Sequence, residues 1–163
     1  MARILGDSMT SNADDDASLA PSPTPADSAP RLLVIDDDLV FRGTIGKVGE
    51  KAGFAITQAA SYDEAEKLLR QFRFDCITLD LSLGRNYGLE VIRLLDDIGC
   101  KTPVIVISGV GQTVAKLATS VGRMLRLNIC EPVPKPIDFA RLREILARIK
   151  GDFARQGTVA LTP

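Results

Sequence analysis

Residues 74–88 read FDCITLDLSLGRNYG, and the rest of the chain can be arranged around the aspartate near its centre, Asp80. The run Cys76–Leu79 is short, apolar and partly β-branched, which is typical of a strand buried on both faces. In an open α/β sheet the carboxyl ends of the strands border the crevice where ligands bind. The pattern therefore predicts that Asp80 stands at the mouth of a binding site. Considered alone, the stretch is explained equally well by a helix N-cap or loop aspartate.

Length and composition indicate one ordinary domain with a real core. The chain has 163 residues, of which 45% are hydrophobic, and it contains no run of about 20 apolar residues that would span a membrane. The net charge is -1, with 20 Lys and Arg against 21 Asp and Glu. Such a balance provides no general attraction to nucleic acid or to an anionic membrane. We therefore expect neither DNA nor a membrane as a partner.

The residues that the chain lacks exclude several kinds of chemistry. There is no histidine, which rules out a histidine-based triad, a histidine-rich metal site and a phosphohistidine on this chain. The three cysteines, Cys76, Cys100 and Cys130, are odd in number and widely spaced. They indicate reduced thiols in a cytoplasmic protein and not a disulfide framework or a zinc site.

Composition divides the chain into three parts. Residues 1–30 are rich in Asp, Ser and Pro and are predicted to form a disordered extension, because they cannot bury enough apolar surface to offset the entropy of ordering. They do not resemble a signal peptide, and translation from Met9 instead of Met1 stays open. Residues 31–150 are predicted to form the domain, and residues 151–163 a short tail without comparable patterning.

Strand and helix patterns alternate along residues 31–150. Five such alternations predict a parallel sheet with helices on both faces. The predicted strands are 32–35, 54–59, 76–80, 104–107 and 128–133, and the predicted helices are 39–52, 61–72, 89–98, 113–125 and 138–150.

Local signals add detail to these helices. Ser61 with Glu64 three residues later predicts a capping box, and Asp138 is predicted as the N-cap of the last helix. Leu117 is predicted to face the core from helix 113–125. Helix 39–52 carries three glycines that its apolar spacing places off the core-facing side: Gly43, Gly46 and Gly49.

Four of the predicted strands end in a polar group. Asp36–Asp38 follow the first strand, Asp80 the third, Ser108 the fourth and Lys135 the fifth. Because the carboxyl ends of parallel strands share one edge, these groups can converge on one crevice. Clustered carboxylates repel one another unless a cation lies between them, and hard oxygen ligands favour Mg²⁺. A carboxylate beside such a metal can attack phosphorus, while a lysine and a hydroxyl stabilise the transferred charge.

Each of these residues also has an ordinary structural explanation. An acidic triplet after a strand often forms a solvated loop with an N-cap, Ser108 before a glycine suits a turn, and Lys135 between prolines suits the surface. The combination of acid, acid, hydroxyl and lysine at four separate strand ends favours a site.

Four segments resemble the signature segments of the receiver domain of two-component response regulators. They are LLVIDDD (32–38), CITLDLSLG (76–84), VIVISG (104–109) and VPKP (133–136). The resemblance extends from Arg31 to about Lys150. It implies a flavodoxin-like, doubly wound α/β fold with a five-stranded parallel sheet in the order 2-1-3-4-5 and helices on both faces.

The resemblance also implies roles at the acidic end of the site. Asp80 corresponds to the phosphoacceptor, and Asp36 and Asp37 to the acid pair that coordinates Mg²⁺. Ser82 corresponds to the residue whose backbone carbonyl completes the protein ligands of the metal, together with Asp80.

The remaining roles concern the opposite side of the site. Ser108 corresponds to the hydroxyl that follows the phosphoryl group, and Lys135 to the lysine that pairs with it. Gly109 corresponds to the small residue that leaves the approach to Asp80 open, and the peptide bond before Pro136 is expected to be cis, which an X-Pro bond adopts at a cost of only about 0.5–1 kcal/mol.

The chain departs from the family pattern in three places. Gly84 stands where the family often has proline, and Pro132 stands where the family has an aromatic switch residue. The segment from Ser108 to Lys135 is also longer than usual. These departures concern the route by which the family usually transmits its signal, through the fourth helix and fifth strand.

The first hypothesis is a stand-alone, cytoplasmic receiver that acts as a signalling module and not as an enzyme. It accepts a phosphoryl group on Asp80 from a sensor histidine kinase or phosphotransfer protein and signals through an unknown downstream protein. No output domain is expected after the last helix, and a homodimer stays open.

Two alternatives use the same residues differently. Pro132 and the altered fourth-helix region favour a receiver-fold interaction module that works without phosphorylation. A phosphatase of the haloacid-dehalogenase type also uses an aspartyl nucleophile, but it needs a second carboxylate two positions further on, where this chain has Ser82.

Overall fold

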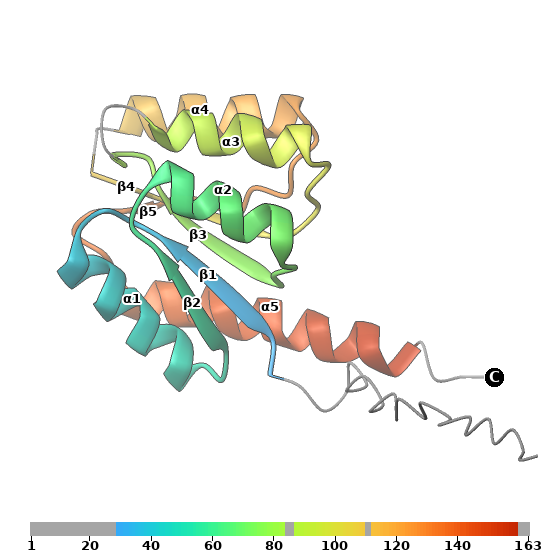
Figure 1. The fold of residues 1–163 in the computed structure, drawn as a ribbon. Coiled ribbons are helices and arrows are strands. Elements are labelled where there is room, and N and C mark those ends of the chain that lie inside the picture. Colours follow the sequence, from blue (N-terminus) through green and yellow to red (C-terminus); the bar gives the residue numbers. More distant parts are fainter. Residues whose placement is uncertain (1–28, 84–86, 110–111, 160–163) are drawn as a thin grey trace, which may run out of the picture.

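The computed structural model describes residues 29–83, 87–109 and 112–159. Its sheet has five parallel strands in the order β2-β1-β3-β4-β5 (Figure 1), which confirms the predicted flavodoxin-like architecture. The extension predicted over residues 1–30 lies almost wholly outside the described residues, as does Gly84. No helix in the described ranges has the length and apolar content needed to cross a membrane.

The elements follow the predicted alternation. In chain order they are β1 (Arg31–Ile35), α1 (Leu39–Lys51), β2 (Ala55–Ala59), α2 (Tyr62–Gln71), β3 (Cys76–Asp80), α3 (Tyr87–Asp97), β4 (Val104–Ser108), α4 (Gln112–Met124), β5 (Val133–Pro134) and α5 (Phe139–Val159). The last helix therefore continues beyond Lys150, through residues that the sequence pattern assigned to a tail.

Helices cover both faces of the sheet. Figure 1 shows α2, α3 and α4 on one face and α1 and α5 on the other. Every residue of β3 and β4 is buried. Because side chains alternate along a strand, β3 supplies Ile77 and Leu79 to the core under α2, α3 and α4, and Cys76 to the core under α1 and α5. The same alternation places Asp80 on the α1 and α5 face.

The predicted caps are present. The Ser61 hydroxyl accepts the backbone N–H of Glu64 at 3.2 Å, and the Glu64 carboxylate accepts the N–H of Ala60 at 2.8 Å. Asp138 accepts the N–H groups of Ala140 and Arg141 at 2.9 and 3.1 Å. Both helices thus begin where a side chain satisfies N–H groups that have no partner within the helix.

The glycines of α1 show where the sequence prediction was wrong. Gly46 and Gly49 are buried and face the sheet. A Cβ atom on Gly49 would lie 2.7 Å from Ile56 Cδ1 and from Leu32 Cδ2, whereas nothing lies within 4 Å of a Cβ on Gly43. The missing side chains at positions 46 and 49 let α1 pack closely on β1 and β2, which apolar spacing alone does not reveal.

Helix α4 differs from its prediction at Leu117. Leu117 is 57% exposed, while Ala118 is fully buried and Gly122 is buried against Ile129. A Cβ on Gly122 would lie only 2.5 Å from Ile129 Cγ1. The helix therefore packs closely at Ala118 and Gly122, with Val121 partly buried against the same core, and Leu117 faces solvent.

The fifth strand is shorter than predicted. Pairing with β4 consists of an isolated bridge between Val104 and Ile129 and a two-residue ladder that begins at Ile107 and Val133. Between these pairs the fifth segment has one residue more than β4, which constitutes a bulge. Pro132 lies in this bulge, and because proline has no backbone N–H it cannot continue the ladder.

A close backbone contact joins α3 to the end of β3. A Cβ on Gly88 would lie 2.6 Å from Leu81 Cα and 2.9 Å from the carbonyl oxygen of Asp80. Backbone atoms cannot move aside as a flexible side chain can. Only glycine therefore allows the first turn of α3 to lie against the segment that carries Asp80.

We expect Gly88→Ala to destabilise the protein by about 1–3 kcal/mol, the usual cost of adding a methyl group to a tightly packed region. The matched control is Gly43→Ala, which should be stabilising by up to about 1 kcal/mol because alanine favours the helix and the space is open. Urea unfolding of both variants measures the difference, and equal free energies of unfolding would contradict the contact at Gly88.

Candidate functional site

The candidate site lies where β1 and β3 end. Asp36 directly follows β1, and Asp80 is the last residue of β3. The two strands are adjacent in the sheet, with Ile35 paired to Leu79. Both carboxylates are almost completely buried, at 1% and 2% exposure. The sheet therefore holds two acids side by side at its carboxyl edge, as the sequence predicts.

Asp37 completes an acidic cluster. One carboxylate oxygen from each of Asp36, Asp37 and Asp80 lies within 4.8 Å of the others. Asp37 is exposed, so the cluster is open to solvent on that side. Backbone N–H groups bind the buried members: Asp38 donates to Asp36 Oδ1 at 2.8 Å, and Ser82 donates to Asp80 Oδ1 at 3.0 Å.

Lys135 provides the positive charge of the site. Its ammonium nitrogen Nζ lies 2.8 Å from Asp80 Oδ2 and 3.3 Å from Asp36 Oδ2. Its backbone N–H donates to the carbonyl of Ser108 at 2.9 Å, which ties the residue to the end of β4. The following peptide bond, Lys135-Pro136, is cis as expected. One ammonium group therefore bridges two buried carboxylates that come from different strands.

The protonation behaviour reflects burial and charge. Burial raises the pKa of Asp36 above its ordinary value, and the nearby charge of Asp80 acts in the same direction, against the hydrogen bond from Asp38 and the charge of Lys135. For Lys135, burial alone would lower the pKa, but hydrogen bonds and charges from Asp80 and Asp36 outweigh it and raise the pKa. Lys135 is thus held in its charged form, whereas an ionised Asp36 is costly.

These residues fit a divalent cation. Three carboxylates face one ammonium group, so the cluster has more acidic than basic side chains. Mg²⁺ prefers oxygen ligands and is usually held by one or two carboxylates and several waters. Asp37 is exposed, so solvent reaches this side of the cluster.

The other predicted residues lie at the same edge. Ser108 is buried at the end of β4, and its neighbour Ile107 pairs with Asp80. Ser82 has its backbone in the loop that follows β3, and the metal-binding role of its carbonyl stays a prediction. A Cβ on Gly109 would lie 3.6 Å from the Lys135 side chain, an ordinary contact distance.

The structure adds two residues that the sequence did not indicate. Arg42 Nη1 donates to the backbone carbonyl of Asp36 at 2.7 Å, and the Phe41 ring lies beneath the Lys135 ammonium, 4.5 Å from its centroid. Phe41 has helical spacing typical of a core residue, so the sequence does not indicate that its ring also contacts Lys135. Both residues come from the first turn and a half of α1, directly after the acidic triplet.

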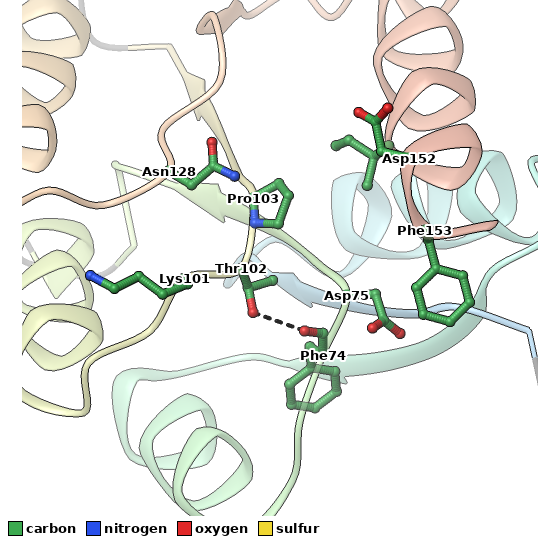
Figure 2. Close-up of a pocket in the computed structure, with 9 residues that line it drawn as sticks. Phe74, Asp75, Lys101, Thr102, Pro103, Asn128, Asp152 and Phe153 are labelled. Carbon is green, nitrogen blue, oxygen red and sulfur yellow. Dashed lines mark hydrogen bonds between the residues drawn. The ribbon is translucent and has the colours of Figure 1, made fainter. Parts of the chain in front are cut away.

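A separate pocket of about 320 Å³ lies at the opposite edge of the sheet (Figure 2). It is lined by residues that precede β3 and β4, including Asp75 and Thr102, and by Asp152 and Phe153 of α5. Thr102 donates to the carbonyl of Phe74 at 2.8 Å. None of its lining residues belongs to the acidic cluster, which lies beyond the carboxyl ends of the same strands.

Comparison with known families and proteins agrees with this geometry. The profile of the family described as response regulator receiver domain matches residues 32–147. The Regulator of RpoS of Escherichia coli (strain K12) is 31% identical over 117 residues, which are 71% of this chain and 33% of the relative. The regulatory protein VirG of Agrobacterium fabrum is 32% identical over 131 residues, 80% of this chain and 49% of the relative. The chain thus spans a third to a half of the length of these relatives.

Solved structures show the same fold. A response regulator from Colwellia psychrerythraea superposes with a TM-score of 0.69 and 25% identity, covering 77% of this chain and 99% of the other. A response regulator protein from Burkholderia pseudomallei superposes with a TM-score of 0.62 and 27% identity, covering 82% and 75% of the two chains.

We expect Asp36→Asn to stabilise the metal-free protein at neutral pH. Because the pKa of Asp36 is raised in the folded state, the native protein loses stability as pH rises from the ordinary value of 3.8 through that raised pKa. The amide avoids this loss, so the advantage of the variant should grow over the same pH range and vanish below it. Thermal unfolding between pH 3 and pH 8 in the presence of a chelator provides the measurement.

The control is Asp38→Asn, at the N-cap of α1. Hydrogen bonds from the N–H groups of Phe41 and Val40 lower the pKa of Asp38, so its charged form favours folding above its ordinary pKa. This variant should show no gain at neutral pH. A gain for Asp38→Asn, or none for Asp36→Asn, would contradict the charge balance described above.

Proposed function

This chain belongs to the response regulator receiver family, and we propose that it is a phosphorylatable receiver whose phosphoacceptor is Asp80. The observation that carries the proposal is the position of the Asp80 carboxylate. It lies at the buried end of β3, 2.8 Å from the Lys135 ammonium and beside two further acids. A nucleophilic carboxylate next to a fixed positive charge is what phosphoryl acceptance requires.

The proposed donor is a phosphohistidine of a sensor histidine kinase or phosphotransfer protein, because this chain has no histidine of its own. An oxygen of the Asp80 carboxylate attacks phosphorus, and the phosphorus–nitrogen bond breaks. The bonding electron pair returns to the imidazole, which takes up a proton from solvent, and an acyl phosphate forms on Asp80. The phosphoryl group of this aspartyl phosphate carries about 1.5–2 negative charges at neutral pH, and it replaces the single negative charge of the carboxylate.

Two side chains are proposed to receive that charge. Lys135 already touches Asp80 Oδ2 and would shift its hydrogen bond to a phosphoryl oxygen. Ser108, buried at the end of β4, would follow with its hydroxyl. Both act as groups that stabilise charge and not as proton donors in the transfer.

A magnesium ion would be held by Asp36, Asp37 and Asp80, with the carbonyl of Ser82 as a further ligand. When bound, Mg²⁺ supplies positive charge that offsets the negative charge of the cluster and of the incoming phosphoryl oxygens. The excess of carboxylates over ammonium groups at this edge supports the assignment.

The relatives support a role in signalling. The Burkholderia pseudomallei structure is described as containing a phosphorylated aspartic acid and a calcium ion, and the two curated relatives are named as regulators. For the present chain we propose a cytoplasmic signalling module, not an enzyme, that acts on a downstream protein. Size measurement with and without phosphorylation would test whether the chain forms a homodimer.

The Asp80 assignment predicts loss of phosphorylation in Asp80→Asn. Wild-type protein incubated with acetyl phosphate and Mg²⁺ should gain the mass of one phosphoryl group, because the carboxylate is the nucleophile. Asp80→Asn should be modified at least tenfold less than the wild type. Intact-protein mass spectrometry provides the measurement.

The matched control is Asp75→Asn, at the opposite end of the same strand and outside the acidic cluster. It should be phosphorylated like the wild type. Equal modification of wild type and Asp80→Asn would reject Asp80 as the phosphoacceptor.

A second candidate function is an interaction module that keeps the fold but works without phosphate. The specific observation in its favour is the bulge at Pro132, which interrupts the pairing of β5 with β4. The family usually has an aromatic residue at this position. A module of this kind has no need of a metal site.

Magnesium-dependent stability distinguishes the two functions. A ligand present at 100 times its dissociation constant adds about 2.7 kcal/mol to the free energy of unfolding, so millimolar Mg²⁺ should raise the Tm of a functional receiver by several degrees. Asp37→Asn should reduce this shift, because it removes one ligand of the cluster. Thermal unfolding with and without Mg²⁺ is the measurement, and an absent shift in the wild type would favour the interaction module.

A further inference from the structure

The Lys135 ammonium lies between carboxylates and an aromatic ring. On one side are Asp80 Oδ2 at 2.8 Å and Asp36 Oδ2 at 3.3 Å. On another side is the ring of Phe41, whose centroid is 4.5 Å from Nζ. A cation over the face of an aromatic ring within about 6 Å is attracted by the ring quadrupole. The lysine therefore has a third partner besides the two acids.

The first turn of α1 fixes the position of this ring. Asp38 caps the helix and accepts the N–H groups of Val40 and Phe41 at 2.8 and 3.0 Å. Arg42 donates to the carbonyl of Asp36 at 2.7 Å. The backbone of Phe41 is thus tied to the loop that carries the site acids, and its ring is partly buried against the core under α1 and α5.

A ring in this position restricts the lysine in two ways. Lysine has four flexible carbons and loses about 2 kcal/mol of rotamer entropy when fixed, so an additional partner lowers the share of conformations that point away from Asp80. The ring also keeps water from one side of an ammonium whose side chain is only 15% exposed. Fewer competing waters strengthen its hydrogen bonds to the carboxylates.

The aromatic contact comes from α1 and not from the fifth strand. Pro132, Val133 and Pro134, the residues that lead to Lys135, have no aromatic ring. The aromatic partner of Lys135 is therefore Phe41 of the first helix, and the position of Phe41 in the sequence does not indicate this contact.

We propose that Phe41 is a positioning residue for Lys135. The Phe41 ring holds the Lys135 ammonium group beside Asp80, where the ammonium group can bind the incoming phosphoryl group. The contact itself is a property of the unphosphorylated protein. Its effect on phosphorylation rests on the proposed function, and the two are tested separately.

The first test needs no phosphorylation. Protons on the Cε carbon of Lys135 that lie over an aromatic ring are shifted upfield in the NMR spectrum, and Lys135→Arg identifies the signal by its loss. Phe41→Tyr keeps the ring and should keep the upfield shift. Phe41→Leu keeps an apolar side chain without a ring and should return the signal to the position of an ordinary lysine. An unchanged signal in Phe41→Leu would overturn the proposal.

The second test measures the rate at which acetyl phosphate modifies Asp80 in the presence of Mg²⁺. Loss of a cation–π contact should slow Phe41→Leu by about two- to tenfold, while Phe41→Tyr should stay within about twofold of the wild type. Val48→Ala is the control for general destabilisation, because Val48 is buried in the same helix and packs in the same core. It should lower the Tm without slowing phosphorylation.

The outcomes separate the two proposals. If Phe41→Leu reacts as fast as the wild type, or if Val48→Ala slows the reaction as much as Phe41→Leu does, the positioning role is wrong. If the wild type is not phosphorylated at all, the proposed function fails, and the NMR signal alone decides whether Phe41 positions Lys135.

Discussion

The structure depends on the electrostatic balance at the carboxyl edge of the sheet. Three carboxylates lie close enough to share one ion, and one ammonium group, Lys135, lies among them. Because Asp36 and Asp80 are buried, their charges are poorly solvated. Their electrostatic interactions with nearby charges are therefore stronger than they would be at the protein surface. A fold that keeps such a cluster must gain the necessary free energy elsewhere, and here β3 and β4 provide it through complete burial.

The acidic cluster is connected to the surrounding elements through the backbone. Asp38 both donates to Asp36 and caps α1, and Gly88 lets α3 lie directly against the segment after Asp80. Lys135 is joined to the end of β4 through its own N–H. A change of charge at Asp80 would therefore act on α1, α3 and the β4 edge together. Lys135, whose ammonium contacts both Asp36 and Asp80, is the charged group closest to such a change.

The fifth segment differs from the regular pattern of the other strands. Prolines at positions 132, 134 and 136 remove N–H donors from the segment, and its pairing with β4 is limited to an isolated bridge and a two-residue ladder. The neighbouring helix α4 packs through Ala118 and Gly122 and leaves Leu117 exposed. By contrast, α1 contributes an aromatic ring and a capping aspartate to the site. The described contacts to the site lysine and acids are thus concentrated at α1 and the strand ends.

The sequence by itself determined the order and type of the elements, the parallel sheet and the residues at each strand end, because these follow from local periodicity, capping residues and turn chemistry. Only the tertiary structure decided how the helices are rotated and how closely they pack. It placed Gly46 and Gly49 against the sheet, turned Leu117 outward and brought Phe41 beneath Lys135. The bonds from Lys135 to Asp80 and Asp36 join residues 55 and 99 positions apart. Such contacts depend on the packing of whole elements in three dimensions, and no pattern within a single segment contains that information.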